Sequence, residues 1–122
     1  MVLMNIEKEM LENCSLNKSA LLDYGFIKCQ ERYKYSTKIM NNKFRVDLTI
    51  DSNGKITGKI FDLKNLEEYT NFRIKNFGSF SATVVEEYRK VLKSVIDTCY
   101  IKKFLLMIKL IEFIKILLTV TV

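Results

Sequence analysis

Apolar and polar side chains alternate with a period of two through residues 32–61, which is the pattern of half-buried β-strands. The alternation is clearest at 44–50 and continues on either side, at 32–39 and 56–61. Asn41-Asn42 and the run Asp51-Ser52-Asn53-Gly54 are turn sequences that separate these segments. The pattern predicts an antiparallel meander of three strands, with a possible fourth near 72–74.

The period is helical at both ends of this region. Apolar residues form one stripe along 84–99, and the stripe predicts a long helix with Thr83 or Ser81 as its N-cap. Shorter helices are predicted at 5–14 and 17–24, the second capped by Asn17 and ended by Gly25. The predicted fold class is α+β: an antiparallel sheet of three or four strands whose apolar face is covered by the long helix and the short N-terminal helices.

The composition excludes several kinds of catalytic site. The 122 residues include no histidine, so a Ser-His-Asp triad, a Cys-His dyad and a His-ligated metal are impossible. Cys14, Cys29 and Cys99 are odd in number and widely spaced, which predicts free thiols and a cytoplasmic location. We expect a protein that is not an enzyme and has no catalytic residues, cofactor or metal.

The C-terminal segment differs from the rest of the chain, and this predicts a division into an α+β domain at 1–101 and an apolar helix at 102–122. Fourteen of the nineteen residues in 104–122 are apolar, and Lys109, Glu112 and Lys115 interrupt them. A membrane span, a helix lying in a membrane surface and a surplus core helix are the alternatives. The same codons can encode a polar segment in another reading frame. We therefore also hypothesise that a frameshift made this tail and truncated a longer protein.

Basic residues gather on the predicted outer face of the sheet, where strand alternation places seven cations against Asp47 alone. Phe61 is predicted to lie among them as an aromatic platform for base stacking. The net charge of the chain, +6, has the same sign. Binding of phosphates by these side chains is one interpretation, and a solvated face whose lysines prevent edge-to-edge association is the other. The predicted nucleic-acid-binding residues are Arg32, Lys34, Lys38, Arg45, Lys59, Phe61, Arg73 and Lys75.

The segment from Tyr24 to Cys99 resembles the N-terminal domain of two-domain MmcQ/YjbR family proteins. The resemblance rests on FRVDLTID at 44–51, GKIFDL at 58–63, EEYTNFRI at 67–74 and VVEEYRKVL at 84–92. It implies DNA binding without an established enzymatic activity or cofactor. It also implies a chain that ends before the YjbR domain proper. No binding residue of the family is carried over to a position in this sequence.

Three partners follow from these observations. DNA on the basic face is the first expectation, with weak binding that does not depend on sequence. A protein partner, or a second copy of the chain, on the apolar tail is the second, as expected for a scaffolding domain. A membrane surface at the same tail is the third.

Overall fold

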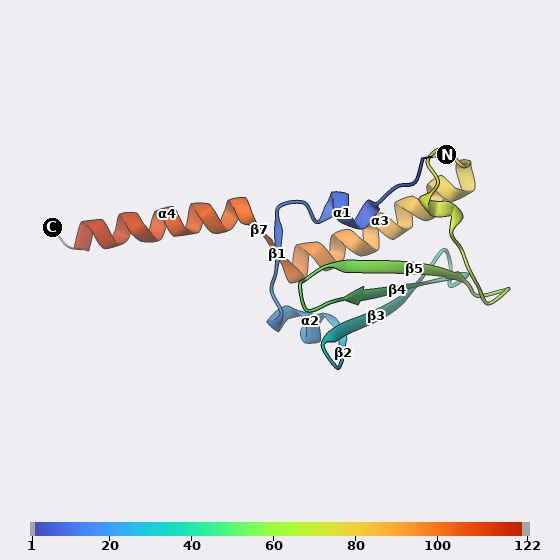
Figure 1. Cartoon of the computed structure of the whole chain (residues 1–122), viewed down its shortest axis with the longest axis horizontal. Coiled ribbons are helices and arrows are strands. Elements are labelled where there is room, and N and C mark those ends of the chain that lie inside the picture. Colours follow the sequence, from blue (N-terminus) through green and yellow to red (C-terminus); the bar gives the residue numbers. More distant parts are fainter. Residues whose placement is uncertain (1, 121–122) are drawn as a thin grey trace.

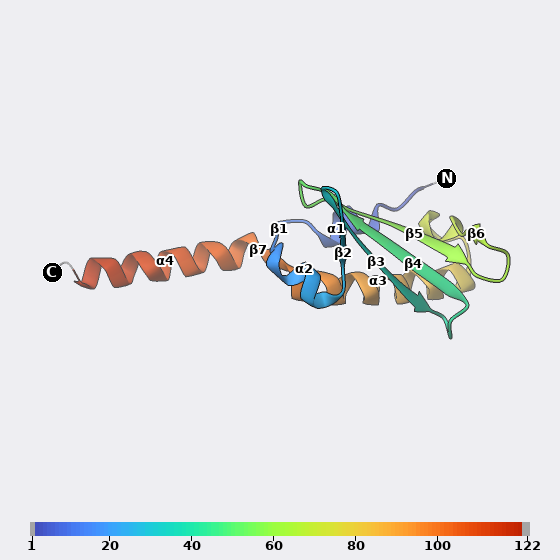
Figure 2. The ribbon, with the colours of Figure 1, turned by 90° about the horizontal axis from the view of Figure 1, so that it is seen from below.

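The protein has an α+β fold in which helices cover one face of an antiparallel sheet, as predicted. The structure, a computed structural model, describes residues 2–120, with the side chains of all of these except 104–106 and 120. The helix α3 (Ser79–Cys99) runs along one face of the sheet, and α1 (Ile6–Met10) and α2 (Ser19–Tyr24) lie beside it (Figures 1 and 2). A last helix, α4 (Lys103–Val120), points away from this body.

The main sheet has five strands in the order β2-β3-β4-β5-β6, with every neighbouring pair antiparallel. It is therefore a meander, and its central strands match the predicted segments. Asn41 and Asn42 form the turn between β3 and β4 with positive φ angles, and Gly54 does so between β4 and β5. The strands are β2 (Ile27–Cys29), β3 (Arg32–Ile39), β4 (Phe44–Ile50), β5 (Ile56–Asp62) and β6 (Glu67–Glu68).

The predicted count of three or four strands is wrong, and so is the strand predicted near 72–74. That segment is a short 3₁₀ helix, η1 (Asn71–Arg73). Phe72 is buried there, with its ring 5.1 Å from that of Tyr88 on α3, and Ile74 makes only an isolated bridge with Leu3. A short apolar run does not distinguish a strand from a helical turn, and the contact with α3 favours the turn.

The core lies between the sheet and α3. On β4 every second side chain, from Phe44 to Ile50, is buried, while the residues between them face the other way. The helix α3 packs against these residues with a stripe of buried side chains along its length, as predicted. This stripe consists of Val84, Tyr88, Leu92, Val95, Ile96 and Cys99.

The ends of the helices differ from the predicted ones. The helix α3 begins at Ser79, after Gly78, so neither Thr83 nor Ser81 is its cap. Ser81 is buried instead, and its hydroxyl lies 2.6 Å from that of Tyr69. The helix α1 is shorter than predicted because the chain turns into β1 (Cys14–Leu16), which pairs with β7 (Tyr100–Lys102).

The helix α2 ends at Gly25 with φ of 126°, as predicted, but Asn17 is not its cap. Lys18 occupies the cap position, and the Asn17 side chain accepts a hydrogen bond from the Ser19 hydroxyl at 2.7 Å. The predicted division into 1–101 and 102–122 stays a prediction, although β7 and α4 begin close to that boundary. Within residues 2–120, no helix combines the length and the apolar character that crossing a membrane requires.

Candidate nucleic-acid interface

The open sheet face, defined as the side of the main sheet opposite α3, carries most of the predicted basic residues. In an antiparallel sheet, directly opposed residues lie on the same face. Lys38 opposes Arg45, which opposes Phe61 on β5, and Asp47 opposes Lys59. Lys34 and Arg32 lie on the same face of β3, four and six residues before Lys38. Six of the eight predicted residues therefore share this face: Arg32, Lys34, Lys38, Arg45, Lys59 and Phe61.

Arg73 and Lys75 do not lie on the open sheet face, and this part of the prediction is wrong. Strand alternation does not apply to them, because η1 stands where the fourth strand was expected. The Arg73 guanidinium reaches the helix side of the sheet, where it binds Glu7 and the carbonyl oxygen of Gly58. Lys75 follows η1, and its own backbone N–H donates a hydrogen bond to the carbonyl oxygen of Val2 at 2.9 Å.

Glu68 also belongs to this face, and the sequence did not reveal it. It opposes Phe61 across the β5–β6 pair. The face therefore holds five cations against the two carboxylates of Asp47 and Glu68, a net charge of +3, where the sequence predicted +6. The two-residue strand β6 is too short for its alternation to be recognised in the sequence.

Arg45 is held in place at the centre of the face. Its Nε donates to Asp47 Oδ1 at 2.9 Å and its Nη2 to Oδ2 at 3.1 Å, while the Ser36 hydroxyl donates to the same carboxylate at 2.6 Å. The Arg45 guanidinium also lies over the ring of Phe61, 5.0 Å from its centroid. This ring is already stacked, so base stacking there requires Arg45 to move.

Four cations remain for a ligand: Arg32, Lys34, Lys38 and Lys59. All four are exposed, and within residues 2–120 no carboxylate lies within ion-pair distance of them. Three of them lie on β3, where Arg32 and Lys34 are about 7 Å apart along the strand and Lys34 and Lys38 about 13 Å. The open sheet face can therefore offer separate positive charges to successive anionic groups.

A second polar cluster, formed by Glu7, Arg73 and Tyr88, lies on the other side of the sheet. Arg73 donates to both carboxylate oxygens of Glu7, at 2.9 and 2.5 Å, and the Tyr88 hydroxyl donates to Glu7 Oε1. Burial alone would raise the pKa of Glu7, but the hydrogen bonds from Arg73 and Tyr88 outweigh it and hold that pKa below its ordinary value.

The chemistry of this cluster is that of an ion pair. Burial and the bond to Glu7 raise the pKa of Tyr88, so its hydroxyl stays protonated and donates. Each carboxylate oxygen of Glu7 has a donor. The cluster joins α1, η1 and α3, and we interpret it as a structural connection. Nothing in the local sequence reveals it, because Glu7 and Arg73 are 66 positions apart.

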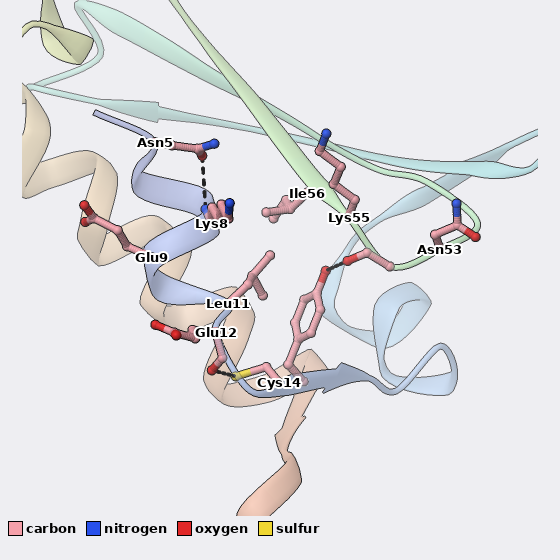
Figure 3. A pocket seen from close by; sticks show the side chains of 11 residues that line it. Asn5, Lys8, Glu9, Leu11, Glu12, Cys14, Asn53, Lys55 and Ile56 are labelled. Atoms are coloured by element: carbon pink, nitrogen blue, oxygen red, sulfur yellow. Dashed lines mark hydrogen bonds between the residues drawn. The ribbon is translucent and has the colours of Figure 1, made fainter. Parts of the chain in front are cut away.

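A groove of about 780 Å³ lies between α1, the β1–β7 pair and the turn before β5 (Figure 3). Lys8 and Lys55 line it together with Glu9 and Glu12, so its positive and negative charges are equal in number. Tyr100 also lines the groove, and its hydroxyl donates to the Gly54 carbonyl oxygen at 2.9 Å. The lining is mixed in character, and we assign no chemistry to it.

Metal ligands are not clustered in the described part of the chain, where no three side chains of His, Cys, Asp or Glu come together to hold an ion. Comparisons with protein-family models, with curated proteins and with solved structures found no match to this chain. The resemblance to the MmcQ/YjbR family gains no support from them and stays a prediction. The candidate interface therefore rests on the geometry of the open sheet face alone.

Proposed function

We propose that this chain is a non-enzymatic module that binds nucleic acid weakly, and without sequence preference, through the open sheet face. The observation that supports the proposal is a group of four exposed cations on one face that form no ion pair with a carboxylate of residues 2–120: Arg32, Lys34, Lys38 and Lys59. Lysine and arginine bind nucleic acid mainly through its phosphates, which carry no sequence information. The MmcQ/YjbR resemblance implies the same activity, but it does not carry the proposal.

The number of cations sets the expected strength and salt dependence. Binding that neutralises four phosphates of a single strand has a slope of log K against log salt of roughly −2.8. Affinity should then fall about 50-fold between 50 and 200 mM salt. Arg45 adds little to this slope, because Asp47 already neutralises it.

The experiment is a fluorescence-anisotropy titration of a labelled single-stranded oligonucleotide across a salt series. We expect the double reversal Lys34→Glu and Lys38→Glu to weaken binding at least tenfold. The matched control, Lys8→Glu and Lys18→Glu, changes the net charge equally on two exposed lysines, in α1 and at the start of α2, on the helix side of the sheet. We expect it to weaken binding less than threefold.

Three results would refute the proposal. Equal losses in both reversals would show attraction by net charge without a defined face. Binding that does not respond to salt, or that strongly prefers one of two oligonucleotides of equal length, would exclude phosphate contacts as its source.

The proposal also assumes a cytoplasmic protein. Cys14, Cys29 and Cys99 are free thiols, as proteins of the reducing cytoplasm commonly have. Fractionation of cells that express the tagged chain would test this location.

A further inference from the structure

The helix α4 exposes a broad apolar surface away from the body of the protein. All described side chains from Met107 to Thr119 are exposed, most of them those of large apolar residues. An 18-residue helix rich in isoleucine is only marginally stable alone in water. A stable α4 therefore needs a partner surface to cover its apolar side chains.

Seven of the nine exposed large apolar residues of α4 follow a heptad pattern, and Ile108 and Ile116 lie outside it. With Met107 at position a, residues 107, 110, 114 and 117 occupy a and d, and 111, 113 and 118 occupy the flanking e and g positions. The three charged residues, Lys109, Glu112 and Lys115, fall at c, f and b, away from this stripe. We call the a, d, e and g residues the α4 stripe: Met107, Leu110, Ile111, Phe113, Ile114, Leu117 and Leu118.

The α4 stripe is nearly symmetric about position 112. Reversing the direction of the helix exchanges 107 with 117, 110 with 114 and 111 with 113, and each exchange replaces one large apolar residue by another. The lysines at 109 and 115 exchange as well. In a two-fold contact between identical chains each residue i meets j while j meets i, and here each such pair consists of two large apolar residues.

The exposed area is large enough for a stable pair. With roughly 100 Å² exposed by each large apolar side chain, the stripe exposes on the order of 700 Å². Two copies facing each other would remove up to about 1,400 Å² from water, within the range of stable protein interfaces.

The position of α4 favours an antiparallel arrangement. The helix projects from one end of the body, so a second copy has access to it (Figures 1 and 2). Parallel pairing would bring the Lys102 and Lys103 side chains of both chains together at the base of the helices. Antiparallel pairing puts the two bodies at opposite ends of helices about 27 Å long.

We propose that the chain self-associates through an antiparallel contact between the α4 stripes of two copies. In this contact Leu110 of one chain packs against Ile114 of the other. The proposal does not depend on nucleic-acid binding, and the experiments below contain no nucleic acid.

Sedimentation velocity of the full chain, from micromolar to about 100 micromolar, tests the association. We expect a species larger than the monomer, and we expect Leu110→Gln with Ile114→Gln to weaken association at least tenfold. The matched control, Ile108→Gln with Ile116→Gln, also replaces two exposed aliphatic residues, but at b and c, and should retain association. Because α4 is only marginally stable alone, circular dichroism should report less helix for the Leu110→Gln, Ile114→Gln variant than for the control at the same concentration.

Cross-linking tests the orientation in a background with Cys14→Ser and Cys29→Ser, which removes the two native thiols that are not buried. A mixture of Leu110→Cys and Ile114→Cys chains should form a disulfide-linked dimer under oxidation, whereas each chain alone should not. Dimers within each single preparation, or none in the mixture, would overturn the antiparallel contact. A wild-type chain that stays monomeric would overturn self-association, and so would a monomeric chain that floats with phosphatidylcholine–phosphatidylserine vesicles. Equal weakening of the association by the two pairs of glutamine substitutions would overturn it as well.

Discussion

Replacement of Glu7 by glutamine is the perturbation that tests most directly how the fold is held together. Glu7 is 5% exposed, and its carboxylate receives hydrogen bonds from Arg73 and Tyr88. Glutamine has nearly the same shape but no charge. Glutamine replaces one carboxylate oxygen by an NH₂ group, which donates hydrogen bonds and does not accept them. Facing the donors of Arg73, this group would lose a hydrogen bond from Arg73.

The expected loss follows from the partner left behind. Breaking a buried ion pair from one side costs about 3–5 kcal/mol, because the remaining charge stays buried without compensation. The Arg73 side chain is 29% exposed, so water partly compensates its charge, and we expect a loss at the lower end of this range, about 3 kcal/mol. For a domain of this size that corresponds to a fall in Tm of about 12 °C.

Urea denaturation at neutral pH measures this loss, and Glu9→Gln is the matched control. Glu9 lies on the same helix and pairs with Arg89 at 3.3 Å, but its side chain is 62% exposed. A surface pair of this kind contributes about 0–1 kcal/mol. If the two glutamine variants lose equal stability, the reasoning on the buried pair is wrong.

The pH dependence gives an independent check. Because the pKa of Glu7 is lower in the folded protein than its ordinary value of 4.5, the unfolded chain binds more protons as the solution becomes acidic. The ion pair therefore stabilises the fold fully above that value and loses its effect as the pH falls through the folded pKa. The difference between wild type and Glu7→Gln should shrink below about pH 4.5. A constant difference down to pH 3 would contradict the assignment.

Three further predictions concern residues outside the Glu7 cluster and the two proposed interfaces. Gly58→Ala should lower the free energy of unfolding, measured in urea, by about 1–3 kcal/mol, because the new Cβ would lie 1.8 Å from the Tyr88 hydroxyl. A variant as stable as the wild type would show that this space is free. Tyr100→Phe should lose about 1 kcal/mol with its hydrogen bond to the turn before β5, and no loss would contradict that bond. Iodoacetamide should modify the exposed Cys29 first and Cys99 only on unfolding, since burial shields the Cys99 thiol and raises its pKa. Mass spectrometry measures the order of modification, and the opposite order would contradict the prediction.

The sequence was most informative where one face of an element is fully buried. The segments 44–50 and 32–39 are strands with the predicted bounds, because their alternating side chains must face either the core or water. Helix starts were less predictable. The helix α3 begins five residues before the predicted 84, in a segment where Phe80 stays exposed and only Ser81 is buried, so the apolar stripe gives no signal there.

The candidate site was predictable as far as it depends on strand register, and no further. Six of its eight residues lie on one face because strands β3, β4 and β5 pair as expected. Arg73 could not be placed, since its position depends on Glu7, which is distant in sequence. The stacking of Arg45 on Phe61 is also a contact between strands. The Phe61 ring, predicted to be free for base stacking, is covered by the Arg45 guanidinium.

The two proposals concern parts of the chain that do not share a core. All members of the described core cluster lie between residues 6 and 100, so none of the described side chains of α4 belongs to it. An antiparallel contact through α4 would join two bodies, each with its own open sheet face. Joining two weak sites raises the affinity for a ligand long enough to reach both, because the second contact becomes intramolecular. If both proposals hold, Leu110→Gln with Ile114→Gln should weaken binding of a long single strand while leaving that of a short one unchanged. Equal losses for both lengths would show that α4 contacts the nucleic acid itself.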